Sequence, residues 1–203
     1  MTIVDSTEEL GRRDRKKLET RAALERAALT LVAERGLAGV TVEDIAEAVD
    51  VSSRTFFNYF PSKEDALLGR SPSSEAELLR RLADVPPQAS ALQALRVVLR
   101  EEAERVQERR EEWLLRLKVF EQNPSLLPKL ISGGAESERR LAAAVAGRLG
   151  DDPAAAAHAG LVTAVALTAF RVSMMRWSTV DTSLAGLVDA AFEALAEGLP
   201  DPS

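Results

Sequence analysis

A three-residue turn between two short helical patterns constrains the fold of this chain more than any other feature. Residues 41–49, TVEDIAEAV, favour one helix, and residues 53–59 favour another. The turn between them is DVS (50–52), whose Asp50 is one of the few residues other than glycine that tolerate a positive φ. A longer apolar helical pattern, about 14–35, precedes the pair. This order of elements predicts a helix-turn-helix unit.

Capping residues mark where these short helices begin. Thr41 is followed three residues later by Asp44, a capping box with Asp in place of the usual Glu. Ser52 can cap the third helix in the same way, Pro61 ends that helix, and Ser62 can cap a fourth. Local sequence therefore predicts each boundary of the unit.

The remainder of the chain also favours helices. Ala and Leu dominate, and long segments lack Gly and Pro, so we expect an all-α fold with about nine helices. The stretch 69–77, with Gly, Pro and three serines, indicates a hinge or a broken helix. We therefore expect a helix-turn-helix domain at 12–68 and a larger helical domain at 73–200. The expected helices of the larger domain cover about 90–110, 111–122, 125–149, 153–178 and 181–198, with Gly133 and Gly134 punctuating them and Asp181 or Thr182 capping the last.

Composition argues against several classes of function. The absence of cysteine excludes disulfides, thiolate metal sites and cysteine nucleophiles. A single histidine, His158, cannot assemble a convincing metal-ligand set. The sequence has no glycine-rich phosphate loop and no nucleophile elbow, so an enzyme is disfavoured and no cofactor is expected.

The most apolar stretch is residues 154–170. It is rich in Ala, ends at Arg171, and is shorter than the roughly 20 clearly apolar residues of a membrane helix. We expect a helix buried on most sides in protein and no membrane span. Residues 1–17 lack the apolar core of a signal peptide, which agrees with a cytoplasmic protein.

Charge is spread unevenly. The net charge is −6, yet residues 12–21 carry six basic residues against two acidic ones, a local net of +4. Residues 71–203 carry 15 basic and 19 acidic residues, a net of −4. A basic arm on an acidic body suits contact with a polyanion, and a solvated, frayed tail is the alternative.

Residues 15–68 contain three motifs in a fixed order: an apolar helix that ends in ERG, then TVEDIA, then VSSRTFFNYFPSKE. In order and spacing these motifs resemble the DNA-binding domain of TetR-family transcriptional regulators. Two positions depart from the pattern: Asp50 replaces the usual Gly, and Phe57 replaces the usual Tyr, so no phenolic hydroxyl reaches a phosphate there. The resemblance implies a homodimer that binds a palindromic operator in double-stranded DNA and a C-terminal domain that binds a small-molecule inducer.

The candidate DNA contacts lie at the start of the third helix and around it. Arg54 is the best base reader, because a guanidinium can bind guanine O6 and N7 together; a phosphate contact is the alternative. Asn58 can pair with adenine or contact the backbone, and Lys63 matches a phosphate contact of the family. The full set is Arg21, Thr41, Ser52, Ser53, Arg54, Thr55, Asn58, Tyr59 and Lys63.

Four of the nine aromatic residues fall within five positions of this helix. We expect Phe56 and Phe60, four residues apart, to face the first two helices, and Phe57 to fill the junction. Tyr59 is expected to keep its hydroxyl towards a phosphate. The rings are thus interpreted as a scaffold for the polar residues before them.

The last two helices are the candidate dimer seam. Small residues on one helix, spaced by four, let backbones approach closely, and an apolar stripe follows on the other helix. Packing inside one subunit is the alternative. The residues concerned are Ala156, Gly160, Ala164, Leu184, Leu187, Val188, Ala191 and Leu195.

An apolar face over 111–120 is the candidate inducer pocket, with ordinary core as the alternative. For His158, buried and hydrogen-bonded packing is favoured over ligand contact. Arg171 and Arg176 flank the apolar helix and would suit an acyl-CoA-like ligand. The pocket residues proposed are Trp113, Leu117, Phe120, Phe170, Met174 and His158.

The sequence thus predicts a ligand-responsive homodimeric repressor, in which the ligand shifts the fourth helix (62–69). An activator and a non-specific architectural DNA-binding protein are the alternatives. The second of these would normally be more basic than an isoelectric point near 5.1 allows.

Overall fold

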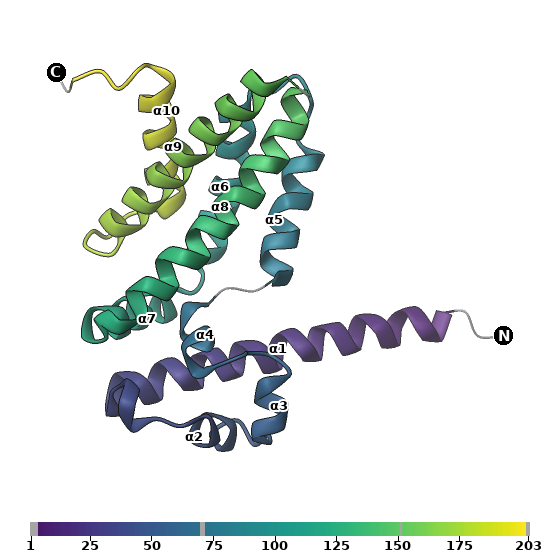
Figure 1. Cartoon of the computed structure of the whole chain (residues 1–203), viewed down its shortest axis with the longest axis vertical. Coiled ribbons are helices and arrows are strands. Elements are labelled where there is room, and N and C mark those ends of the chain that lie inside the picture. Colours follow the sequence, from purple (N-terminus) through teal and green to yellow (C-terminus); the bar gives the residue numbers. More distant parts are fainter. Residues whose placement is uncertain (1–3, 70–71, 151, 202–203) are drawn as a thin grey trace. The chain divides into compact units, whose positions relative to one another are not determined.

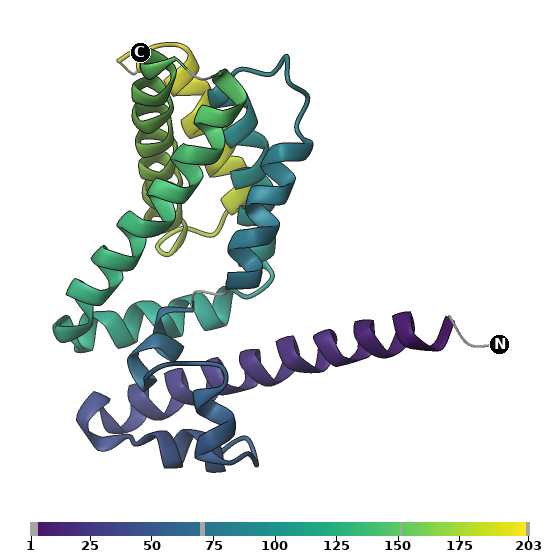
Figure 2. The ribbon, with the colours of Figure 1, turned by 45° about the vertical axis from the view of Figure 1, so that its right-hand side comes forward.

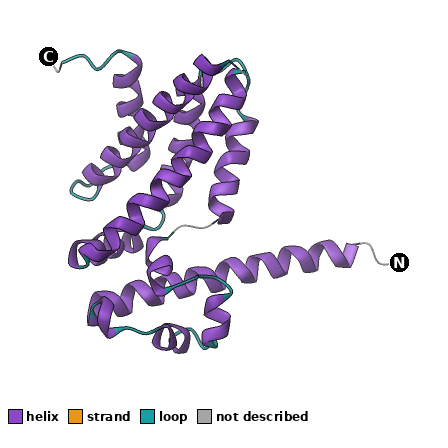
Figure 3. Cartoon of the chain, in the orientation of Figure 1, coloured by secondary structure: helices purple, strands orange, loops and turns teal. Residues whose placement is uncertain are grey.

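The computed structural model describes residues 4–69, 72–150 and 152–201, and side chains within these ranges except at 4–10, 12–14 and 72–73. The described chain contains ten α-helices, two 3-10 turns and no strands, which confirms the all-α fold (Figures 1 and 3). The α-helices are α1 (Val4–Arg35), α2 (Val42–Glu47), α3 (Ser53–Phe57), α4 (Lys63–Leu68), α5 (Pro72–Asp84), α6 (Ala91–Gln107), α7 (Arg110–Gln122), α8 (Leu127–Leu149), α9 (Pro153–Trp177) and α10 (Leu184–Ala196), and the 3-10 turns are η1 (Leu37–Gly39) and η2 (Pro124–Leu126).

The helices form two compact units. The first comprises Met1–Arg70 and Glu111–Leu127, and the second comprises Ser71–Arg110 and Pro128–Ser203. Segment 111–127, which the sequence assigned to the second domain, is grouped with the first unit, because Val119 of α7 is fully buried in that unit's core. A long-range packing partner of this kind leaves no local mark in the sequence.

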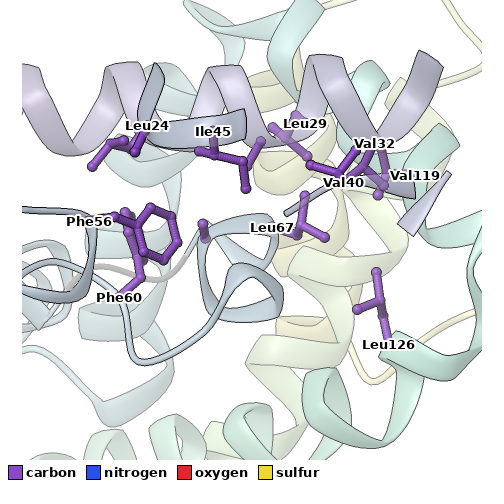
Figure 4. Close-up of a cluster of buried hydrophobic side chains, with 13 residues drawn as sticks. Leu24, Leu29, Val32, Val40, Ile45, Phe56, Phe60, Leu67, Val119 and Leu126 are labelled. Carbon is purple, nitrogen blue, oxygen red and sulfur yellow. The ribbon is translucent and has the colours of Figure 1, made fainter. Parts of the chain in front are cut away.

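The core of the first unit lies between α1 and the three short helices that follow it. Figure 4 shows Phe56 and Phe60 beside each other near Leu24 of α1, and their ring centroids are 5.5 Å apart. Both rings are buried, as predicted. Phe57 is 54% exposed, so the expectation that it fills the junction was wrong. In a helix, the residue that follows an inward-facing one is rotated about 100° away from it, and Phe57 directly follows Phe56.

Several element boundaries differ from the sequence-based expectation. Helix α1 begins at Val4, ten residues before the predicted start. Helix α5 begins at Pro72, inside the stretch expected to be a hinge, and proline suits the first turn of a helix. Helix α8 runs from Leu127 to Leu149, close to the expected 125–149, and continues through Gly133 and Gly134, because one or two glycines weaken a long helix without ending it.

The second unit is built around α6, α9 and α10, which pack against one another (Figure 2). Its largest buried side chains include Trp177 of α9, Phe192 of α10 and Leu95 of α6. The cap of the last helix is Ser183, one residue after Thr182 and two after Asp181, since the hydroxyl of Ser183 accepts a hydrogen bond from the Gly186 N–H.

Ion pairs at Asp189 reinforce the packing of α10 on α6. The Nε atoms of Arg96 and Arg100 each donate to Asp189, one to each carboxylate oxygen, at 2.9 Å. Burial alone would raise the pKa of Asp189, but the hydrogen bonds from these two guanidinium groups outweigh it and lower the pKa below its ordinary value. The carboxylate is therefore held in its charged form.

We predict that Asp189→Asn lowers the free energy of unfolding by about 1 kcal/mol at pH 7, because hydrogen bonds to a charged acceptor are lost. A lowered folded-state pKa stabilises the protein above the ordinary pKa of a carboxylic acid, and this stabilisation disappears as the pH falls through the folded-state value. Denaturant unfolding between pH 7 and about pH 3 should therefore show the difference between wild type and variant shrinking with acid. Asp181→Asn, at a fully exposed position, is the control and should change little. A difference that stays constant down to the lowest pH would contradict the ion-pair account.

Candidate DNA-reading interface

The first short helix of the pair begins with the predicted capping box. The hydroxyl of Thr41 accepts from the Asp44 N–H at 3.1 Å, and the Asp44 carboxylate accepts from the Thr41 N–H at 2.7 Å and from its hydroxyl at 2.6 Å. The hydroxyl hydrogen bond and then the backbone one lower the pKa of Asp44. Thr41 remains exposed, so capping the helix leaves its side chain accessible to DNA.

The turn keeps the geometry that glycine normally provides. Asp50 has φ 55°, in the left-handed region, and the Val51 N–H donates to the Ala46 carbonyl at 3.0 Å. An aspartate can adopt this conformation at moderate cost. The replacement of the family's usual Gly therefore leaves the turn intact.

The recognition helix α3 presents a polar edge at its start. The hydroxyl of Ser52 accepts from the Thr55 N–H at 3.1 Å and lies 2.9 Å from the Thr55 hydroxyl. Ser52 and Arg54 are exposed, whereas Ser53 and Thr55 are half-buried. Within the residues that the structure describes, the Arg54 guanidinium has no hydrogen-bond or ion-pair partner. The long, positively charged side chain of Arg54 lies on the exposed side of a capped helix and can therefore reach a nucleic acid.

Helix α3 ends at Phe57, two residues earlier than predicted. Asn58 is its C-cap and is exposed, and Tyr59 follows half-buried against the core. The chain then turns so that the Phe60 N–H donates to the Phe56 carbonyl at 3.0 Å. The short helix is thus closed on both sides by specific hydrogen bonds.

Arg21 lies inside the unit instead of on a basic surface. Its Nη1 donates to the carbonyl of Tyr59 at 2.9 Å, and its Nε is 3.1 Å from the Glu25 carboxylate. Its guanidinium carbon is 4.1 Å from the Phe60 ring centroid, a cation–π distance. Only 14% of its side chain is exposed. Arg21 therefore anchors the end of the recognition segment to α1, and its sequence-based assignment as a phosphate contact is not supported by this geometry.

Lys63 is also engaged within the protein. Its Nζ donates to the carbonyls of Leu37 at 2.7 Å and Val40 at 2.6 Å, which closes the η1 turn onto α4. An ammonium group has three N–H bonds, so two internal hydrogen bonds leave one for a phosphate. The structural role and the predicted phosphate contact are compatible.

The predicted basic run is described only in part. Arg15, Lys16 and Lys17 are exposed on α1. The side chains of 12–14 lie outside the described residues. The exposed cations extend along the same helix that carries Arg21 at its buried end.

Two sequence profiles and a curated relative match this chain. Residues 25–68 match the profile described as bacterial regulatory proteins, tetR family, and residues 89–200 match the MftR C-terminal domain. The HTH-type transcriptional regulator TcmR of Streptomyces glaucescens is 34% identical over 196 residues, which cover 93% of this chain and 86% of TcmR. The chain belongs to the TetR family of transcriptional regulators.

Solved structures share this TetR-family fold. A putative TetR-family regulator from Mesorhizobium loti aligns with a TM-score of 0.53 at 16% identity, over 89% of this chain and 96% of that one. FadR from Bacillus subtilis, in complex with stearoyl-CoA, aligns with a TM-score of 0.51 at 17% identity, over 87% and 98% of the two chains. Identities this low establish the fold alone.

In this TetR-family chain the predicted pocket residues fall in different units. Trp113, Leu117 and Phe120 lie half-buried on α7, in the first unit, and Phe120 packs against that unit's core. On α9, in the second unit, Phe170 and Met174 are half-buried. His158 is exposed there, so the expectation of buried packing was wrong. The first half of α9 is rich in Ala, and this composition does not indicate which side of the helix is covered by the rest of the chain.

The predicted dimer residues divide between the inside and the outside of the second unit. Leu184 and Val188 are fully buried within their own chain, which matches the alternative that the sequence left open. Ala156 is exposed, and the others are half-buried: Gly160, Ala164, Leu187, Ala191 and Leu195.

Helix α9 was expected to be buried on most sides, and only 17% of its most apolar window is buried. By length and composition alone it could cross a membrane, but one such helix is only weak evidence for a membrane span. Its exposed apolar residues are Leu161, Val172 and Met175, at 65%, 53% and 51% exposure. Their positions fit a stripe spaced alternately by four and three, which also contains the half-buried Val165 and the polar, exposed Thr168. That spacing is present in the sequence and identifies a different face of α9 from the one marked by the small residues Ala156, Gly160 and Ala164.

We predict that Arg21→Met destabilises the first unit by about 3 kcal/mol, because Glu25 stays buried after losing its close partner. The salt dependence of DNA binding should keep its slope, whereas loss of a phosphate contact would reduce it by about 0.9 per contact. Denaturant unfolding and DNA titrations at several salt concentrations measure both quantities. Lys17→Met, on the exposed part of α1, is the matched control and should leave stability unchanged. A variant as stable as wild type would contradict the anchoring role.

Proposed function

We infer that this TetR-family protein is a homodimeric, cytoplasmic repressor that reads a palindromic operator through α3 and is released by a small ligand. The observation that carries the DNA-reading part is the exposed Arg54, which has no hydrogen-bond or ion-pair partner among the described residues and lies on the capped edge of a helix-turn-helix. In this motif the N-terminal residues of the second helix enter the major groove. Ser52, Ser53, Thr55 and Asn58 then supply hydrogen-bonding groups around Arg54.

A dimer follows from the need to bind two half-sites. The polar edge of one α3 helix makes few base contacts. Tight binding therefore requires the α3 helix of a second copy, about one helical turn of DNA or more away. We infer that the exposed stripe of α9, represented by Leu161, Val172 and Met175, is covered by the same helix of a second copy. The alternation of four and three residues is the spacing of helix pairs that pack along a common seam. The neighbouring α10, which packs against α9, would complete a four-helix bundle.

The first unit contains a contact that can transmit a ligand signal to the DNA-reading helices. Gly69, the C-cap of α4, has φ 66°, and a Cβ added there would lie 1.8 Å from Nη1 of Arg116 on α7. The same guanidinium reaches Glu112 at 3.0 Å and Glu25 of α1 at 4.0 Å. Any displacement of α7 would therefore press on the end of α4 and on α1. This extends the sequence-based expectation that the fourth helix moves.

The ligand is proposed to be apolar or acyl-containing and to bind within the second unit. Arg171 and Arg176 are exposed near the end of the apolar α9 and would suit an anionic head group. Thr163 is fully buried on α9, and its hydroxyl has no hydrogen-bond partner among the described residues. Buried hydroxyls are normally satisfied, so this one is a candidate ligand contact. A ligand releases DNA only through unequal affinity for the two states of the protein.

We predict that Arg54→Ala relaxes the sequence preference by about 1–3 kcal/mol at the base it reads. Lys63→Ala should weaken binding to all DNA sequences similarly. It should also lower the midpoint temperature of unfolding, because the carbonyls of Leu37 and Val40 lose their hydrogen-bond donor. Gel-shift titrations of both variants against a selected operator and its single-base changes measure these effects. An Arg54→Ala protein with unchanged sequence preference would contradict the base-reading assignment.

We predict that Val172→Glu converts the dimer to a monomer, because a charge would be buried in an apolar seam. Operator affinity should then fall by about two orders of magnitude or more, since the second half-site is no longer tethered. Analytical ultracentrifugation and gel shifts test this. Val97→Glu, at an exposed valine of α6, is the matched control and should stay dimeric. If the Val172→Glu chain sediments as a dimer, the seam lies elsewhere.

A further inference from the structure

The recognition helix carries a large apolar side chain on its outer surface. Phe57, the last residue of α3, is 54% exposed, whereas Phe56 and Phe60 on either side of it are buried. The Phe57 ring meets the Phe56 ring edge to face, with centroids 5.7 Å apart and an angle of 89° between the planes. The buried Phe56 ring therefore fixes where the exposed ring stands.

Phe57 shares its side of the helix with the candidate base reader. Residues three and four apart lie on the same face, so Phe57 stands beside Arg54 and Ser53. Arg54 is exposed as well. If Arg54 reaches a base edge in the major groove, the ring of Phe57 enters the same groove.

The chemistry of the groove leaves one partner for such a ring. A phenyl ring has no hydrogen-bond donor and so cannot bind a phosphate oxygen. Among the groups that base pairs present in the major groove, the C5 methyl of thymine is the apolar one. We propose that Phe57 is a specificity-determining residue that packs against a thymine methyl in each half-site. This rests on the proposed function, because it requires α3 to enter the groove.

The position of the thymine follows from the helix. Side chains three residues apart on a helix have Cβ atoms about 5–6 Å apart. Successive base pairs are separated by about 3.4 Å. The thymine contacted by Phe57 therefore lies within about two base pairs of the base contacted by Arg54.

The experiment uses an operator selected from random duplex DNA with the wild-type protein. Each thymine is replaced in turn by deoxyuracil, which removes the methyl and leaves the base-pairing and hydrogen-bonding groups unchanged. At one position per half-site, the replacement should weaken wild-type binding by about fourfold, and by about fifteenfold when made in both half-sites.

Phe57→Ala should bind thymine and deoxyuracil operators equally, because the contact is already absent. Phe57→Leu keeps an apolar side chain and should retain part of the sensitivity to the deoxyuracil replacement. This variant tests the proposal if the alanine variant folds poorly. Circular dichroism melting and sedimentation verify folding and assembly of both variants.

The proposal is overturned if no deoxyuracil replacement weakens wild-type binding. It is equally overturned if Phe57→Ala keeps the wild-type sensitivity, since another side chain would then read the methyl. Wild-type protein that prefers no sequence over random DNA would instead overturn the proposed function, so the two failures are distinguishable. Dissociation of the dimer in both Phe57 variants would assign the ring to a protein interface and also overturn the proposal.

Discussion

The buried guanidinium of Arg21 is the interaction on which the DNA-reading unit depends. It contacts three groups at once, Glu25 on its own helix and, in the segment after α3, the Tyr59 carbonyl and the Phe60 ring. Helix α3 has five residues, far fewer than an isolated helix needs for stability in water. Its position must therefore come from tertiary contacts. Arg21, with the inward rings of Phe56 and Phe60, supplies them.

This arrangement separates support from recognition within one short segment. The rings at 56 and 60 and two basic side chains, Arg21 and Lys63, hold the backbone from inside. The polar edge from Ser52 to Thr55 and the ring of Phe57 lie towards the outside. A chain with few aromatic residues places Phe56, Tyr59 and Phe60 here because a small helical unit needs large side chains to fix a short helix.

Local features of the fold were predictable from the sequence. The capping box at Thr41, the cap at Ser52 and the positive φ of Asp50 each depend on residues within four positions. The family could be recognised from the same stretch. The inward positions of Phe56 and Phe60 followed from helical spacing alone.

Other features depend on contacts between distant residues and could not be predicted in the same way. Arg21 meets a carbonyl 38 residues later, and Lys63 meets carbonyls 23 and 26 residues earlier, so both looked like surface cations. Helix α7 was expected in the second domain, yet it is grouped with the first compact unit, because its Val119 is buried with residues of α1 and the short helices. The exposed stripe of α9 was visible as a spacing, yet whether its own chain covers it is a question of tertiary packing.

Sequence-specific reading of duplex DNA by a dimer is the central claim, and one comparison tests it most directly. Dissociation constants are measured for a palindromic operator selected from random DNA and for a random duplex of the same length, in one buffer across several salt concentrations. The account predicts a preference of about 10³ or more for the selected sequence, with two chains bound per operator. Equal affinity for both duplexes at every salt concentration would contradict it.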